Sequence, residues 1–151
     1  MQTFPPNAHL TLYRVCYADT DCMGRVYYAN YFVFFERART DMLRAMGFPY
    51  SDLEARGCFL PVRGCDARYR GYARFDDELE LLTWVSRLRR ATITFVTAVR
   101  RKGEEQVLVQ GTVELACISE AGKPAPLPDV VLSALGPFVH GPDSSALLLA
   151  A

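Results

Sequence analysis

Two carboxylates stand one residue apart near the N-terminus and are the residues best suited to chemistry. Asp19 and Asp21 occur in "YADTDCMGRVYYANY" (17–31), between an apolar run and a run rich in aromatic residues. A carboxylate can act as a nucleophile or as a general base. Gly24 follows Asp21 closely, and because glycine has no side chain it lets a ligand approach the backbone. The stretch therefore predicts a carboxylate site, with one structural alternative: acids before a helix also serve as caps and turn formers.

Other catalytic groups are scarce in this chain. Histidine occurs only at His9 and His140, in the terminal segments, which leaves little for a Ser-His-Asp or Cys-His arrangement or a His-rich metal site. The sequence contains neither GxGxxG nor GxxxxGK[ST], so no nucleotide cradle is indicated. Five cysteines form no CxxC pair. We expect no metal and no cofactor.

Composition predicts one globular domain spanning 1–151, with a core over about 8–135 and a flexible tail over about 140–151. Lys plus Arg and Asp plus Glu number 17 each, which argues against nucleic-acid binding. No apolar run approaches the roughly 18 residues of a membrane span. The N-terminus lacks the pattern of a secretion signal. We expect a cytoplasmic protein with reduced thiols.

The elements that must position the two acids follow from periodicity. Apolar residues at helical spacing predict one amphipathic helix over 29–46, which Gly47 and Pro49 end. Tight connectors at 89–90 and 101–105 predict consecutive antiparallel hairpins. A strand, one long helix and four strands indicate an α+β fold, with an antiparallel sheet wrapped around the helix. The segments with strand-like composition are 9–17, 59–75, 79–88, 91–100 and 106–118.

The start of this helix bears on the acids. The backbone N–H groups of its first turn, from Val26 to Asn30, have no helical acceptor and carry partial positive charge. We expect these N–H groups to face the same space as the Asp21 side chain. A carboxylate would then lie beside the positive end of a helix, which attracts negative charge.

The segment "RVCYADTDCMGRVYYANYFVFFERARTDMLR" resembles the signature region of hot-dog-fold acyl-CoA thioesterases of the 4-hydroxybenzoyl-CoA thioesterase family, most closely the YbgC/FadM-like branch. The shared pattern is a strand ending in an aromatic residue, then D-T-D-x-x-G-x-V-Y-x-x-N-Y, then a helix beginning F-x-x-F-E-x-A-R. The resemblance extends over about 8–135.

The resemblance implies a catalytic role for Asp21, as nucleophile on the thioester or as general base on water. It also implies that the backbone amide of Tyr28 polarises the thioester carbonyl. Many members of the branch carry His where this chain has Tyr28, so the resemblance leaves the acyl preference open. Around the substrate we expect Gly24, Val26, Tyr27 and Asn30.

The phosphates of coenzyme A require cations, and coenzyme A enters here as part of the substrate. The resemblance assigns this role to Arg89 and Arg90 at a hairpin tip. Arginines at such a tip are equally expected to be merely solvated. Three further cations compete for the role: Arg68, Arg70 and Arg74.

The implied function is hydrolysis of an acyl-CoA or acyl-carrier-protein thioester to a free acid and a thiol. Two alternatives stay open: an enzyme for aromatic acyl-CoA of the hydroxybenzoyl or dihydroxynaphthoyl type, and a non-catalytic module that binds acyl groups or a carrier protein. Pairing of exposed sheet edges between chains, together with the resemblance, predicts a homo-oligomer, either a dimer or a tetramer.

Overall fold

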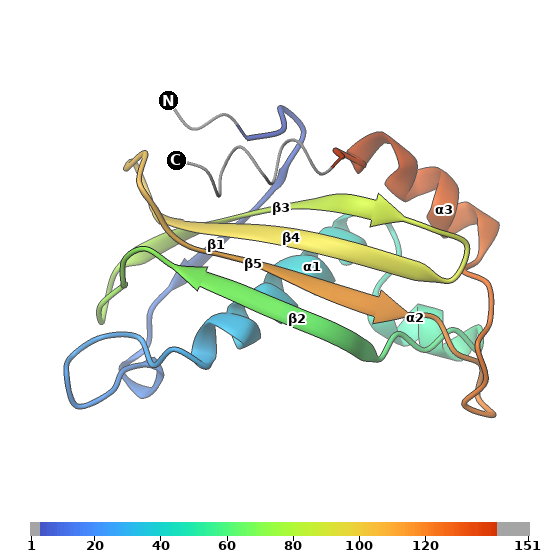
Figure 1. The fold of residues 1–151 in the computed structure, drawn as a ribbon, viewed down its shortest axis with the longest axis horizontal. Coiled ribbons are helices and arrows are strands. Elements are labelled where there is room, and N and C mark those ends of the chain that lie inside the picture. The colour runs from blue at the N-terminus through green and yellow to red at the C-terminus, as the bar shows by residue number, and fades with distance from the viewer. Residues whose placement is uncertain (1–3, 142–151) are drawn as a thin grey trace.

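A five-stranded antiparallel sheet lies against one long helix, α1, in the computed structural model, which describes residues 4–141 (Figure 1). This arrangement confirms the expected α+β, hot-dog-like layout. The helices and strands are β1 His9–Arg14, α1 Asn30–Ala45, α2 Tyr50–Ala55, β2 Val62–Tyr69, β3 Glu78–Leu88, β4 Thr92–Arg101, β5 Val107–Ala116 and α3 Asp129–Leu135, with short 3-10 turns at Tyr17–Asp19 and Gly136–Phe138.

The strands are ordered β1-β3-β4-β5-β2, and every neighbouring pair is antiparallel. The two predicted hairpins therefore exist: β3 turns into β4 and β4 into β5. The strands at the two edges, β1 and β2, each have one neighbouring strand in the described part of the chain. The side chains of β2 are nearly all exposed.

The helix α1 covers one face of the sheet because its apolar residues recur at helical spacing. Phe34, Phe35 and Met42 are fully buried against the central strands. The helix ends where expected, since Gly47 adopts the left-handed conformation at φ 88°. The helix therefore holds its N-terminal end, next to the two acids, in a fixed place over the sheet.

Two expectations about the elements need correction. The first strand ends at Arg14 rather than at residue 17, because Asp19 accepts a hydrogen bond from the Cys16 backbone and closes a 3-10 turn. The region 59–75 contains a strand only over Val62–Tyr69. The helices α2 and α3, of six and seven residues, were not predicted from the sequence, because helices of that length display too little periodicity to be recognised.

The opposite face of the sheet carries a smaller cluster around Trp84, covered in part by Phe4 and Ala8 from the N-terminal segment. Within residues 4–141, no helix is long and apolar enough to cross a membrane. All but the first two residues of the expected tail, 140–151, lie outside the described residues. The extent of the domain and its core stays a prediction.

Candidate active site

Asp21 begins a tight loop that fixes its carboxylate by contacts close in sequence. The carboxylate atom Oδ1 accepts hydrogen bonds from the backbone N–H groups of Met23 (2.9 Å) and Arg25 (3.3 Å). The Asp21 N–H donates to the Arg25 carbonyl (2.8 Å), and the Gly24 N–H donates to the Asp21 carbonyl (3.0 Å). Gly24 adopts φ 72°, which disfavours other residues. Within the described chain Oδ2 has no hydrogen-bond partner, so one carboxylate oxygen is held in place while the other is unpaired.

Asp19 has the structural role predicted for it. Its carboxylate accepts hydrogen bonds from the Tyr13 hydroxyl (2.6 Å) and the Cys16 N–H (2.8 Å). Its backbone carbonyl accepts from the Tyr27 N–H (2.9 Å) and from the side-chain amide of Asn30 (2.8 Å). Burial, together with the Asp19 carboxylate, raises the pKa of Tyr13, which keeps this phenol a donor. Asp19 and Asn30 thus tie the loop to the start of α1.

The backbone amides of Tyr28 and Ala29 differ from those of the residues on either side. The N–H groups of Val26, Tyr27 and Asn30 donate to Ala73, Asp19 and Tyr27 carbonyls, respectively. The expectation that all N–H groups from Val26 to Asn30 are free is therefore wrong. Tyr28 N–H has no acceptor among residues 4–141, and it lies just before the N-terminus of α1, where partial positive charge accumulates.

Asp21 and Tyr28 line one hollow of about 320 Å³. Val26, predicted at the substrate, forms part of its buried wall, and Tyr27 lines it as well. The other residues that line the hollow were not predicted from the sequence: Met23, Arg25, Tyr31, Tyr69, Gly71 and Tyr72. Most of the wall is apolar or aromatic, which suits an acyl thioester better than a free ion.

Tyr69 joins this wall to α1 although it is distant in sequence. Its hydroxyl donates to the Tyr28 carbonyl (3.0 Å), and its ring contacts the rings of Tyr28 and Tyr31. Tyr31 in turn accepts a hydrogen bond from the Ala73 N–H (3.0 Å), and burial raises the pKa of this phenol. The sequence signal for this wall is the alternation of aromatic and basic residues in "RYRGYARF" (68–75), a pattern that predicts a strand and does not indicate a wall beside Asp21.

The structure separates the remaining predicted residues from the hollow. Gly24 and Asn30 do not line it and instead shape the loop. Arg89 and Arg90 are exposed at the β3–β4 turn, at the far end of the sheet from the Asp21 loop (Figure 1). A single chain therefore does not bring Arg89 or Arg90 to Asp21, and their role in binding coenzyme A stays a prediction.

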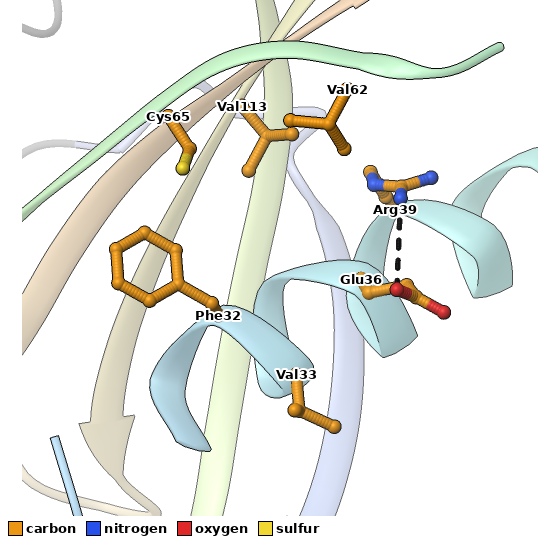
Figure 2. Close-up of a pocket in the computed structure, with 7 residues that line it drawn as sticks. All are labelled: Phe32, Val33, Glu36, Arg39, Val62, Cys65 and Val113. Carbon is orange, nitrogen blue, oxygen red and sulfur yellow. Dashed lines mark ion pairs between the residues drawn. The ribbon is translucent and has the colours of Figure 1, made fainter. Parts of the chain in front are cut away.

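A second hollow, of about 210 Å³, lies between α1 and the edge strand β2 (Figure 2). Its walls are mainly apolar, with Phe32 and Val33 from the helix. Arg39 points into it, and its side chain is only 6% exposed. Among residues 4–141, the buried guanidinium nitrogens Nε and Nη1 have no hydrogen-bond partner, and Nη2 forms a 3.9 Å ion pair with Glu36. A buried charge with two unused donors is costly unless a further group supplies acceptors.

The described residues contain no group of three or more His, Cys, Asp or Glu side chains that could hold a metal ion. All five cysteines are free thiols. The expectations of no metal and no cofactor stay predictions.

Comparison with known proteins identifies the family. Residues 15–135 match the thioesterase-like superfamily. The acyl-CoA thioester hydrolase YbgC of Escherichia coli O157:H7 is 36% identical over 121 residues, covering 80% of this chain and 90% of that protein. The acyl-CoA thioesterase YbgC of Haemophilus influenzae is 39% identical, covering 76% of this chain and 82% of that protein. A probable thioesterase from Bartonella henselae has a similar crystal structure, with a TM-score of 0.75 and 38% identity over 80% of this chain and 99% of that chain.

The chain belongs to the thioesterase-like superfamily. Within that class it is YbgC-like, a thioester hydrolase with the hot-dog fold, which confirms the resemblance found in residues 14–44.

Proposed function

We propose that the protein hydrolyses acyl-CoA thioesters, with Asp21 as the reacting carboxylate and the Tyr28 N–H as the donor to the thioester oxygen. The observation that carries this proposal is that Asp21 and Tyr28 line one hollow, while within the described chain the Asp21 atom Oδ2 and the Tyr28 N–H each have no hydrogen-bond partner. The similarity to proteins named acyl-CoA thioester hydrolases supports the substrate class.

Two routes fit this geometry. In the nucleophilic route, Oδ2 of Asp21 bonds to the thioester carbon, the C–S bond breaks and the thiolate leaves, taking a proton from water. Water then hydrolyses the mixed anhydride and regenerates the carboxylate. In the general-base route, Oδ2 takes a proton from a water molecule that attacks the carbon directly; the C–S bond then breaks, and the leaving thiolate takes the proton from Asp21, which regenerates the carboxylate. The Tyr28 N–H stabilises the oxyanion in either case, a contribution of about 3 kcal/mol for one such donor.

A panel of substrates and an Asp21→Asn variant test the proposal. We expect the unmodified protein to hydrolyse at least one among short, long and aromatic acyl-CoA and acyl-carrier-protein thioesters. Asp21→Asn should lower kcat by about 10²- to 10⁴-fold with an unchanged melting temperature. Asn can keep the Oδ1 contacts to Met23 and Arg25.

Asp52→Asn is a matched control, since Asp52 is an exposed acid in α2 outside the hollow. It should leave kcat unaltered. Full activity of Asp21→Asn would refute the catalytic assignment. Absence of hydrolysis by the unmodified protein on every thioester would instead favour the non-catalytic binding module. Mass spectrometry after one turnover in isotopically labelled water identifies the nucleophilic route if heavy oxygen appears on Asp21, because water that attacks the Asp21 carbonyl of the anhydride leaves its oxygen there, whereas the general-base route never labels Asp21.

We further propose that the active protein is a homodimer in which a second copy covers the hollow at Arg39. Two observations support this occupant. The outer edge of β2 has unpaired backbone groups, which a strand from another copy can pair. Beside that edge, Arg39 has two buried nitrogens with no acceptor in the described chain, and carbonyl or carboxylate groups of the second copy would meet that need.

We also propose a cytoplasmic location. The five free thiols support it, because disulfides are rare where thiols are kept reduced.

A further inference from the structure

Three arginines lie near the exposed loop after β2 without carboxylate partners. The guanidinium carbon of Arg25 lies 4.0 Å from the centre of the Tyr72 ring, and that of Arg74 lies 5.4 Å from it. Arg74 also donates to the Tyr72 hydroxyl at 3.2 Å. Arg70 lies two residues before Tyr72 and lines the hollow described below. Among residues 4–141, none of the three arginines forms an ion pair with a carboxylate.

A fourth arginine fixes the loop but is already neutralised. Arg101 donates from Nε to Asp77 (2.8 Å) and from Nη2 to the Tyr72 carbonyl (2.6 Å), and it pairs with Glu104 at 3.3 Å. The positive charge that remains uncompensated therefore belongs to the three unpaired arginines. The guanidiniums of Arg74 and Arg25 lower the pKa of Tyr72, which agrees with a positive potential at this ring.

The cluster adjoins the proposed active site. Arg70 and Arg74 line a hollow of about 410 Å³, and Gly71 and Tyr72 belong both to this hollow and to the one at Asp21. Arg25 extends from the wall of the Asp21 hollow over the shared Tyr72. A molecule whose thioester lies at Asp21 can thus continue past Tyr72 into a cationic hollow.

We propose that Arg70 and Arg74, with Arg25 beside them, bind the phosphate groups of the coenzyme A part of the substrate. This inference rests on the proposed function. Guanidinium groups bind phosphate oxygens through paired, charge-assisted hydrogen bonds, and a polyanion removes the mutual repulsion of clustered cations. The β3–β4 turn offers Arg89 and Arg90, yet within one chain that turn is at the other end of the sheet (Figure 1).

The test compares substrates that share one acyl group and differ in phosphate content: acyl-CoA, acyl-3′-dephospho-CoA and acyl-pantetheine, which has no phosphate. The double variant Arg70→Ala/Arg74→Ala should raise KM for acyl-CoA about tenfold or more, with unchanged kcat. KM for acyl-pantetheine should stay unchanged, and 3′-dephospho-CoA should give an intermediate effect. The variant Arg70→Lys/Arg74→Lys should recover part of the loss because it retains the charge.

A matched control removes two arginines elsewhere. Arg56 and Arg87 are likewise exposed and without ion pairs in the described chain, and Arg56→Ala/Arg87→Ala should leave all KM values unchanged. The melting temperature of each variant is measured as well, and an unchanged value excludes unfolding as the cause of a change in KM.

The inference is overturned if Arg70→Ala/Arg74→Ala leaves KM for acyl-CoA unchanged, or raises KM equally for acyl-CoA and acyl-pantetheine. An effect of Arg89→Ala/Arg90→Ala without one at Arg70 and Arg74 would move the phosphate site to the β3–β4 turn. Failure of the proposed function looks different: the unmodified protein would then hydrolyse none of the three substrates.

Discussion

At the residue scale, the proposed mechanism depends on a backbone group as well as on the Asp21 side chain. The Tyr27 carbonyl belongs to the same peptide group as the Tyr28 N–H and accepts a hydrogen bond from the Asn30 N–H (2.9 Å). The next peptide group is held by the Tyr69 hydroxyl, which donates to the Tyr28 carbonyl. The donor is therefore oriented before a substrate arrives, which is the condition for effective stabilisation of an oxyanion. This argument applies equally to Tyr or His at the position, because both supply the same N–H.

Tyr28→Pro tests this amide. Proline removes the N–H, and since that N–H has no structural acceptor in the described chain, no hydrogen bond of the fold is lost. We expect kcat to fall by about 10²- to 10³-fold, measured on the best acyl-CoA. Tyr28→Phe keeps both the N–H and the aromatic ring, so its kcat should stay within about threefold of the unmodified enzyme.

A loss with Tyr28→Phe as large as that with proline would assign the role to the side chain instead. If Tyr28→Pro lowers the melting temperature, a second variant replaces the amide between Tyr27 and Tyr28 by an ester. The ester removes the N–H without introducing the proline ring, and its kcat should fall by a similar factor.

Packing between elements depends on a glycine in β5. A Cβ atom built on Gly111 would overlap the ring of Phe35 from α1 and lie 2.6 Å from the Asp66 carbonyl oxygen in β2. The absence of a side chain therefore lets the helix approach the sheet. This approach matters for function because the same helix positions Tyr28 at its start.

Gly111→Ala should lower the free energy of unfolding by about 1–3 kcal/mol, because the helix must move or Phe35 must change rotamer. Chemical denaturation measures this directly. Gly64→Ala in β2 is the matched control, since its Cβ would meet nothing within 4 Å, and it should change stability by less than about 0.5 kcal/mol. Equal effects of the two variants would show that close packing at Gly111 is unimportant.

The contact between β1 and α1 includes polar contacts to the Asp41 carboxylate, and their contribution to stability should depend on pH. The Thr11 hydroxyl donates to Asp41 at 2.8 Å, and His9 lies 3.2 Å from the same oxygen. The hydrogen bond from Thr11 has the largest effect and lowers the pKa of Asp41 below its ordinary value of 3.8. His9 and Arg44 lower this pKa further, whereas burial opposes the shift. A carboxyl whose pKa is lowered in the folded state stabilises the fold above its ordinary pKa, and this stabilisation is lost as pH falls through the folded value.

Asp41→Asn should therefore destabilise the fold at neutral pH by about 1 kcal/mol. The difference from the unmodified protein should shrink as pH falls below 3.8 and disappear in stronger acid. Urea denaturation across that range provides the measurement. A difference that is independent of pH would show that the Asp41 charge contributes nothing.

At the scale of the whole molecule, the proposed homodimer predicts what happens when charge is placed on the face around Arg39. Val33 lies in α1 at the edge of the Arg39 hollow and is 49% exposed. Val33→Glu should convert dimers to monomers at micromolar concentration, as measured by light scattering, because a carboxylate would lose its water in the contact. Activity should fall in parallel if the active form is the dimer.

Val130→Glu in α3 provides a control of matched exposure, at 52%, outside that hollow. It should leave the dimer intact. A monomeric unmodified protein, or equal dissociation by both variants, would refute the dimer contact at Arg39.

The sequence by itself determined those features that depend on residues close together in the chain. The Asp21 loop, the turn role of Asp19, the long helix and the consecutive hairpins all arise from contacts over a few residues or from one repeated spacing. Such contacts leave a local pattern in the residue types, which is why they could be predicted.

Only the tertiary structure decided which distant residues complete the site. Tyr69 reaches the Tyr28 carbonyl across 41 positions of sequence. Arg70 and Arg74 line a hollow that adjoins the Asp21 hollow because β2 pairs with β5 and ends beside the start of α1 (Figure 1). The hairpin arginines, Arg89 and Arg90, lie at the opposite end for the same reason. Strand pairing brings together residues that share no local pattern, so the sequence specified the candidate carboxylate, Asp21, whereas the fold specified its surroundings.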